Sequence, residues 1–192
     1  MIRRLYDWTM SLADTPRALW ALFAIAFVES SVFPIPPDVV MIPMILARPS
    51  RAWLIAGVAL AGSVLGGLLG YYIGHGLFDT IGRPVLEFYG KETYFEAFGN
   101  RYNDYGAWAV LIAGITPFPY KVITILSGST GLNLGVFMLA SVIARGLRFF
   151  VVAALLWKFG TPIRIFIERY LGLLFTAFMV LLIGGLYAVK FL

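Results

Sequence analysis

Cysteine is absent from this sequence of 192 residues, and histidine occurs once. The absence of cysteine excludes disulfides, thiolate metal sites and cysteine nucleophiles, and one histidine cannot build a histidine-rich metal site. Charge is also scarce, because Asp, Glu, Lys and Arg make up 13% of the chain while hydrophobic residues make up 60%. A water-soluble globule of this size needs more polar residues than this to cover its surface. The composition therefore predicts a polytopic membrane protein.

Long apolar segments support this class. Ala52–Phe78 is 27 residues without an acid, Lys or Arg, and Tyr170–Val189 is another 20. Because about 20 residues of helix cross a bilayer core, each segment can span alone. The net charge of +5 comes largely from arginines in short loops and near segment ends. These orient a membrane protein and contact anionic lipid, so we expect no nucleic-acid partner.

Prolines interrupt two further apolar blocks. Residues 18–47 are broken at Pro34, Pro36 and Pro37, and residues 105–144 are broken at Pro117 and Pro119. Proline lacks an amide donor and disfavours helical geometry just before it, so no regular helix continues there. The first block can cross once with a kink or turn back as a re-entrant hairpin. Arg17 at its entrance and Arg48 and Arg51 at its exit favour the hairpin, because both ends then face the cytoplasm.

The two breaks resemble each other in sequence. Pro34-Ile-Pro-Pro-Asp-Val-Val-Met-Ile42 and Pro117-Phe-Pro-Tyr-Lys-Val-Ile-Thr-Ile125 share both flanking prolines, one valine and one isoleucine. The acid Asp38 of the first copy aligns with the base Lys121 of the second. Since one spanning helix separates the breaks, the second hairpin enters from the side opposite to the first. Such an inverted repeat is the usual build of secondary transporters with a site at the midplane.

The expected fold is an all-α polytopic membrane protein with two inverted-repeat halves. Each half is a re-entrant helical hairpin plus a spanning helix, and a C-terminal transmembrane helix follows. We expect one membrane domain with an interfacial helix at 1–16, hairpins at 18–47 and 105–131, a polar interfacial segment at 79–104, and transmembrane helices at 52–78, 134–159 and 166–190. Pro162 is expected to end the helix at 134–159. Gly62, Gly66 and Gly70 recur every fourth residue and predict a face for close helix packing.

Five ionisable residues lie within the apolar blocks: Glu29, Asp38, Lys121, Arg145 and Arg148. Each costs roughly 2.5–3.5 kcal/mol at the centre of a membrane helix, so these residues must pair or face water. One interpretation is a structural salt-bridge cluster, and the other is a polar cavity that binds an anion and moves protons. Two acids against three bases leave one positive charge over, so complete internal pairing is impossible if all five share a site.

We assign candidate roles to these residues accordingly. Lys121, Arg145 and Arg148 are candidates for substrate binding. Arg145 and Arg148, at positions i and i+3 of one helix face, can present two guanidinium forks to one phosphate, although Arg148 can instead face lipid headgroups. Glu29 and Asp38 are the candidate proton carriers, because a buried carboxyl near arginines can titrate within a physiological range.

Three motifs together resemble the DedA family, also called SNARE-associated or VTT-domain proteins. The motifs are Glu29-Ser-Ser-Val-Phe-Pro-Ile-Pro-Pro-Asp38, Gly66-Gly-Leu-Leu-Gly-Tyr-Tyr-Ile-Gly74 and Thr116-Pro-Phe-Pro-Tyr-Lys-Val-Ile-Thr-Ile-Leu-Ser-Gly128, and the third looks most like the YqaA-type branch. The resemblance implies a small inner-membrane protein with two opposed re-entrant hairpins. Its essential acids would match Glu29 and Asp38. Lys121 replaces an arginine of the second hairpin, keeping the charge but losing the bidentate fork.

The resemblance also implies a function, namely movement of lipids such as undecaprenyl phosphate or phospholipids between leaflets, with dependence on proton-motive force. We therefore expect a lipid transporter (flippase or scramblase) in the bacterial inner membrane, with lipids and protons as partners and homo-oligomerisation left open. The alternatives are a proton-coupled ion antiporter and a membrane assembly factor. An enzyme acting on lipid phosphates needs a nucleophile or metal cluster that we do not recognise here, and we expect no cofactor.

Overall fold

The computed structural model describes residues 17–32, 36–90, 92–116 and 118–188, with the backbone course alone at Thr161 and beyond Pro162. Throughout these ranges the secondary structure is helical and contains no strand, which confirms the all-α class. The elements are α2 (Arg17–Ser31), α3 (Asp38–Ala47), a 3₁₀ turn (Pro49–Arg51), α4 (Ala52–Leu77), a π-helical turn (Phe78–Gly82), α5 (Arg83–Phe88), α6 (Glu92–Ile115), α7 (Tyr120–Ser129) and α8 (Leu134–Ala188). The interfacial helix expected at 1–16 lies outside the described residues.

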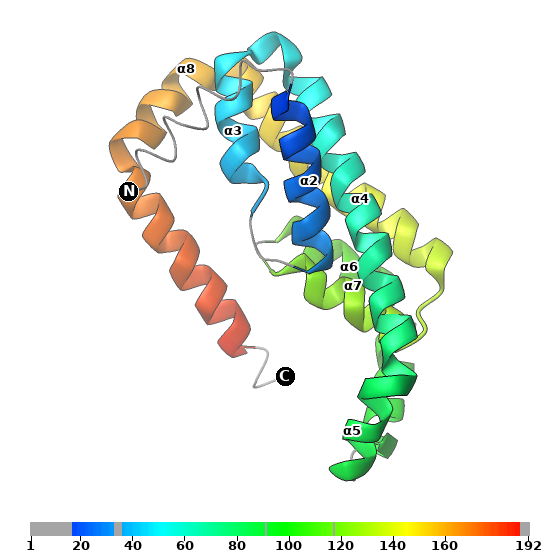
Figure 1. Ribbon diagram of the computed structural model, residues 1–192. Helices are drawn as coiled ribbons and strands as arrows, with labels where there is room; N and C mark the ends of the chain where they lie inside the picture. The colour runs from blue at the N-terminus through cyan, green and yellow to red at the C-terminus, as the bar shows by residue number, and fades with distance from the viewer. Residues whose placement is uncertain (1–16, 33–35, 91, 117, 189–192) are drawn as a thin grey trace.

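Two helix pairs are broken at the proline clusters. α2 ends at Ser31 and α3 begins at Asp38, and the two helices run side by side in opposite directions (Figure 1). α6 ends at Ile115 and α7 begins at Tyr120, directly after Pro119. Of the predicted break residues, Pro36, Pro37 and Pro119 lie at these breaks, whereas Pro34 and Pro117 lie outside the described residues.

α4 packs through its glycines, as the spacing predicted. A Cβ added at Gly62 or Gly66 would collide with backbone carbonyl groups of α2, and one added at Gly74 would collide with the Ile125 carbonyl of α7. Gly70 touches both neighbours, through Thr124 of α7 and the Ser30 carbonyl of α2. Small residues let membrane helices approach this closely, so α4 holds one helix of each broken pair against the same face.

The second half of the chain differs from the expected layout. α6 begins at Glu92, well before the predicted hairpin start at 105, so the polar segment 79–104 is divided among the π-helical turn, α5 and the first half of α6. Between α7 and α8, Gly131 has φ of 66°, and the Leu132 amide donates to the Ser127 carbonyl at 2.9 Å. Glycine adopts this left-handed geometry without strain, so the chain can leave the helical path directly after α7.

The expectation that Pro162 ends its helix is wrong. α8 continues through Pro162 as one helix from Leu134 to Ala188. Proline removes one intrahelical hydrogen bond and typically kinks a helix without necessarily ending it, and Figure 1 shows the last part of α8 turned away from the first. The helix expected at 166–190 is therefore the distal part of α8, with residues 189–190 outside the described range.

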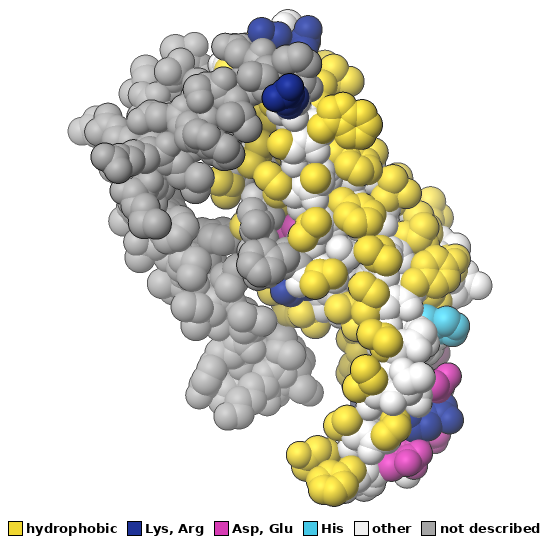
Figure 2. Space-filling model, viewed as in Figure 1, with side chains coloured by type: hydrophobic (Ala, Val, Ile, Leu, Met, Phe, Trp, Pro, Cys, Tyr) yellow, Lys and Arg dark blue, Asp and Glu magenta, His cyan; other side chains and the backbone are white. Residues whose placement is uncertain are grey.

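The surface of the described residues is unusually apolar, and some polar side chains are buried. The polar side chains that are buried include Ser30, Ser63, Thr124, Ser141 and Arg145, whereas exposed positions include many Leu, Ile and Val residues. In Figure 2, hydrophobic side chains cover the face between one end with Lys and Arg side chains and another end that carries histidine together with acidic and basic side chains. Two helices, Pro49–Phe88 and Leu134–Gly160, are long and apolar enough to cross a membrane. Such a surface is stable in hydrocarbon and costly in water.

The interior consists of two apolar clusters. One joins α2, α3, the first turns of α4 and α8 around Phe149 and Leu156. The other joins α4 at Tyr71, α6, α7 and the first turns of α8 around Phe137. On α4 and α8 the clusters leave a gap, and Ser63, Arg145 and Arg148 lie in that gap. A polar layer therefore separates the two clusters, midway along α4 and midway along the Leu134–Gly160 part of α8.

Candidate functional site

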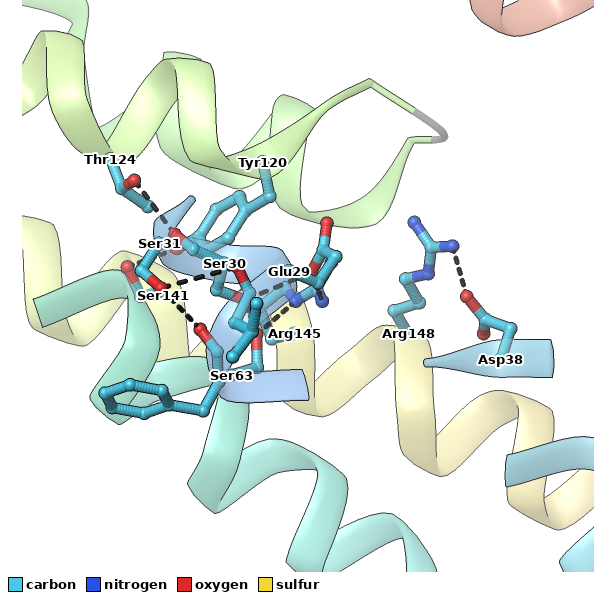
Figure 3. Close-up of polar contacts among 12 residues, drawn as sticks. Glu29, Ser30, Ser31, Asp38, Ser63, Tyr120, Thr124, Ser141, Arg145 and Arg148 are labelled. Carbon is cyan, nitrogen blue, oxygen red and sulfur yellow. Dashed lines mark hydrogen bonds and ion pairs between the residues drawn. The ribbon is translucent and has the colours of Figure 1, made fainter. Parts of the chain in front are cut away.

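Two ion pairs occupy this polar layer, which we call the charge layer and define as Glu29, Asp38, Ser63, Lys121, Arg145 and Arg148. Arg145 Nη2 donates to Glu29 Oε2 at 2.8 Å, and Arg148 Nη2 donates to Asp38 Oδ2 at 2.7 Å (Figure 3). Both arginines come from α8, whereas Glu29 lies near the end of α2 and Asp38 opens α3. The acids on the two sides of the first break are thus held by one helix.

The Arg145 guanidinium is enclosed. Its Nε donates to Ser63 Oγ at 2.6 Å, and its carbon lies 4.9 Å from the centre of the Tyr120 ring and 4.7 Å from that of the Phe149 ring. Arg145 is 1% exposed. A guanidinium over aromatic faces gains cation–π attraction, which is larger when it is desolvated, so Arg145 is stabilised by an acid, a hydroxyl and two rings.

Hydroxyl groups complete the surroundings of Glu29. Ser30 Oγ lies 3.1 Å from Glu29 Oε2 and 2.8 Å from Ser63 Oγ. The Tyr120 hydroxyl donates to Ser141 on α8. A buried charge is tolerated when hydrogen bonds accompany its ion pair, and Glu29, Ser30, Ser63 and Arg145 form one hydrogen-bonded network.

Arg148 connects the two helix breaks. Besides binding Asp38 at the first break, its Nη1 donates to the Thr116 carbonyl at 2.9 Å, directly after the end of α6. That carbonyl lacks an intrahelical partner because the helix stops there. The side chains of Arg148 and Asp38 are 18% and 19% exposed, against 2% and 12% for Arg145 and Glu29. The second pair is therefore the more accessible of the two.

Lys121 makes a different contact. Its Nζ donates to the Val32 carbonyl at 3.0 Å, at the end of α2. One turn further along α7, Thr124 Oγ1 donates to the Ser30 carbonyl at 3.1 Å. Among the described residues Lys121 has no acid within salt-bridge distance. α7 thus satisfies the carbonyls that the end of α2 leaves open, and the two breaks lie against each other.

The structure brings the five predicted ionisable residues into one layer, where four of them form two ion pairs and Lys121 binds a carbonyl. Arg145 and Arg148 share a helix face, yet each holds a different acid instead of converging on one point. Lys121 contacts a carbonyl and Asp38 pairs with Arg148, so the aligned residues of the two breaks are not partners. The three cations and two acids leave one positive charge, as the count from the sequence predicted.

Some contributors escaped the sequence interpretation. Ser63 was one small residue among the glycines of α4, and nothing in its spacing distinguished it. Ser30 follows Glu29 in the sequence and Tyr120 precedes Lys121, and this adjacency was the one signal that could have indicated their place in the site. Among the described residues, no group of His, Asp and Glu could hold a metal ion.

A cavity of about 300 Å³ lies away from the charge layer. It opens between α5, α6 and the end of α7, and its lining residues are Phe78, Arg83, Leu86, Glu92, Phe95, Glu96, Gly99, Asn100, Ser129 and Thr130. None of these belongs to the charge layer.

The chain matches a known protein family over a range that contains most of the charge layer. The VTT domain family matches residues 35–158, a range that includes Asp38, Lys121, Arg145 and Arg148 and begins after Glu29. A Haemophilus influenzae protein described as uncharacterized is 33% identical over 168 residues, 85% of this chain and 87% of that protein. A Histophilus somni protein, described as an uncharacterized HI0703 homolog, is 35% identical over 168 residues with the same coverage. No solved structure gives a significant match.

Proposed function

Because the chain belongs to the VTT-domain or DedA family, whose members are membrane proteins commonly linked to transport or flippase roles, we propose that it moves a lipid phosphate between membrane leaflets. The substrate would be undecaprenyl phosphate or a phospholipid, and its movement would be coupled to protons. The observation that carries this proposal is the charge layer, in which two ion pairs and an additional lysine lie where two broken helices meet.

The depth of the charge layer supports transport across a bilayer. On α4, exposed Trp53 and exposed Tyr72 are 19 residues apart, which is about 28 Å of helix and matches a hydrocarbon core of about 30 Å. Aromatic residues favour the two interfaces of a membrane. Ser63 lies halfway between them, and on α8 Arg145 lies 12 residues before the exposed Trp157. The charges would therefore be at the midplane.

The helix packing supports two inverted halves. Taking α2, α3 and α4 as one half and α6, α7 and α8 as the other, α4 packs on α2 of its own half and α7 of the other. In the same way α8 packs on α6 of its own half and α3 of the other. In each half the third helix thus packs on the first helix of its own half and on the second helix of the other half. A two-fold axis in the membrane plane would give this arrangement, with hairpins entering from opposite sides.

We further propose an orientation in the bacterial inner membrane. Arg17, Arg48 and Arg51 lie at the end of the molecule where α2 begins and α3 ends, and by the positive-inside rule this end faces the cytoplasm. The chain would cross the membrane several times, with the distal part of α8 as the last crossing. The motif around Lys121 would assign it to the YqaA-type branch of the family.

In this function the phosphate headgroup reaches the charge layer while the acyl or prenyl tail stays in lipid. Cationic groups at the midplane lower the barrier to moving an anionic headgroup through hydrocarbon. Protonation of Glu29 or Asp38 would change the charge of the layer and so bias one side of the membrane over the other. This needs no nucleophile and no metal, in keeping with a family whose members are generally non-enzymatic.

The test is a leaflet-exchange assay in phosphatidylcholine vesicles containing the purified protein and a trace of fluorescently labelled lipid phosphate. A membrane-impermeant quencher reports the fraction of label on the outer leaflet, and we expect it to rise towards complete accessibility with the protein present. A labelled diacylglycerol without phosphate measures background exchange, and Lys121→Met should lose the protein-dependent part. A potential-dependent ion flux without lipid exchange would instead favour the antiporter, and neither activity would favour an assembly role.

A further inference from the structure

We infer that the two ion pairs have different roles: Asp38–Arg148 opens when substrate binds, Glu29–Arg145 stays closed, and Lys121 with the released Arg148 holds the phosphate as a monoanion. This inference rests on the proposed function and concerns how the same site selects and holds its substrate.

The surroundings of Arg145 indicate that its pair stays closed. Arg145 is 1% exposed and is held at once by Glu29, Ser63 and the rings of Tyr120 and Phe149. Releasing its guanidinium towards a phosphate would break all of these contacts and leave Glu29 as an uncompensated charge. A buried acid separated from its base in this way is strongly disfavoured. Arg145 therefore acts as part of the core and sets the position of α8 against α2 and α4.

The surroundings of Arg148 indicate the opposite. Its pair with Asp38 is partly exposed on both sides, and Asp38 is the first residue of α3, directly after a proline-rich break. A phosphate oxygen can replace the Asp38 carboxylate at Arg148 because both are oxyanions that suit a guanidinium fork. The contact of Arg148 with the Thr116 carbonyl would keep the guanidinium in place during this exchange.

Among the described cations of the charge layer, Lys121 is the one that a phosphate can reach without breaking an ion pair. Its ammonium group donates to the Val32 carbonyl, a neutral acceptor. Lysine carries a compact charge on a flexible stem, so its head can move to a new anion at little cost. With Arg148 on the other side of the first break, Lys121 forms the second contact to the phosphate.

The charge balance then selects the ionisation state of the substrate. Three cations and two acids give the layer a net charge of +1. Uncompensated charge in a low-dielectric interior is costly, so the most stable complex holds one negative charge on the phosphate. A phosphodiester fits directly. A phosphomonoester, with a second pKa of about 6, fits in its singly charged form and becomes a poor ligand as its second proton is lost.

The charged groups around Asp38 determine how a substitution of this residue changes the charge of the site. Arg148 contacts Asp38 from α8, and Arg145 lies one turn earlier on the same helix. Lys121 is the second residue of α7, and Glu29 lies near the end of α2. Asp38→Asn removes the competitor for Arg148 and raises the net charge to +2, which suits a dianion. Glu29→Gln makes the same formal change next to Arg145, which stays enclosed. The two variants thus match in charge and differ in location.

The experiment measures binding of two fluorescent short-chain lipids to detergent-purified protein at pH 6 and pH 8. The lipids are phosphatidylglycerol, a phosphodiester, and phosphatidic acid, a phosphomonoester, with diacylglycerol as the reference without phosphate. For the wild type we expect phosphatidylglycerol affinity to be the same at both pH values and phosphatidic acid affinity to fall at pH 8. Asp38→Asn should bind phosphatidic acid at pH 8 about tenfold more tightly than wild type, because no acid then competes with the phosphate for Arg148 and the additional positive charge of the layer suits a dianion. Glu29→Gln should not.

The outcomes separate the inference from the proposed function. Wild type that binds neither phosphate lipid better than diacylglycerol overturns the proposed function. Wild type that binds them, with Glu29→Gln tightening as much as Asp38→Asn or with neither tightening, overturns the division of roles and leaves the function standing. Lys121→Met should lose about tenfold for both lipids, and unchanged affinity overturns its role. If Glu29→Gln does not yield folded protein, the comparison of Asp38→Asn with wild type still decides.

Discussion

Replacing Gly74 by alanine tests the close contact between α4 and α7 that supports the charge layer. A Cβ at this position would collide with the Ile125 carbonyl and approach the Ser129 amide, and both are backbone atoms that cannot rotate away. The helices must therefore separate to accommodate one methyl group. α7 also carries Lys121 and Thr124, so its displacement would weaken the two contacts that join the helix breaks.

Gly76 supplies a matched control two residues away in the same helix. A Cβ there meets nothing within 4 Å, so Gly76→Ala brings only the helix propensity of alanine, a gain of about 0.8–1 kcal/mol. Gly74→Ala has the same gain, but it adds overpacking of about 1–3 kcal/mol. Because the obstacle at Gly74 is backbone, we expect the upper half of that range. The two variants should then differ by about 2–3 kcal/mol in the free energy of unfolding, with opposite signs relative to wild type.

The assay is thermal unfolding of the detergent-solubilised protein, followed by the loss of the monodisperse peak in size-exclusion chromatography. For a chain of this length a difference of 2–3 kcal/mol corresponds to roughly 5–10 °C in midpoint. Gly74→Ala should unfold below wild type and Gly76→Ala at or above it. Equal midpoints for the two variants would show that α4 and α7 do not approach as closely as the structure indicates, and the packing argument would then be wrong.

Three further predictions concern the polar groups around Arg145. Glu29→Gln leaves a buried guanidinium without its acid and should lower the free energy of unfolding by about 3–5 kcal/mol. Asp38→Asn, in the more exposed pair, should lower it by about 1 kcal/mol. Chemical denaturation measures both losses, and equal losses would contradict the difference in burial. Ser63→Ala removes the acceptor of the Arg145 Nε and should cost about 1–3 kcal/mol, with Ser63→Thr as the variant that retains a hydroxyl. Tyr120→Phe removes one hydrogen bond and keeps the ring over Arg145, so it should cost about 1 kcal/mol, and a loss as large as that of Tyr120→Leu would show that the ring contributes nothing.

The sequence alone was sufficient for the features that depend on local chemistry. Low charge and long apolar runs predicted membrane helices because a helix satisfies its own backbone in hydrocarbon. The proline clusters predicted where α2 and α6 stop, since the loss of an amide donor acts within one turn. The recurrence of glycine at every fourth residue of α4 predicted a face for close packing. Even the surplus positive charge followed from counting Glu29, Asp38 and the three bases.

Other local signals were misread because a single residue was given too much weight. Pro162 was expected to end a helix, but one missing hydrogen bond is a modest penalty within an apolar helix of 55 residues. The boundary expected at Tyr105, between the polar segment and the second hairpin, falls inside α6, which begins at Glu92.

Which acid meets which base was decided only by the tertiary structure. Glu29 and Arg145 are 116 residues apart, and Asp38 and Arg148 are 110 apart, so no local pattern relates the partners. Their pairing follows from the register of α8 against α2 and α3. That register depends on the glycine contacts of α4 and on the ring contacts of Arg145, which are sums of many small packing terms over distant segments. For the same reason the sequence provided the five charges but could not predict that one pair would be enclosed and the other accessible.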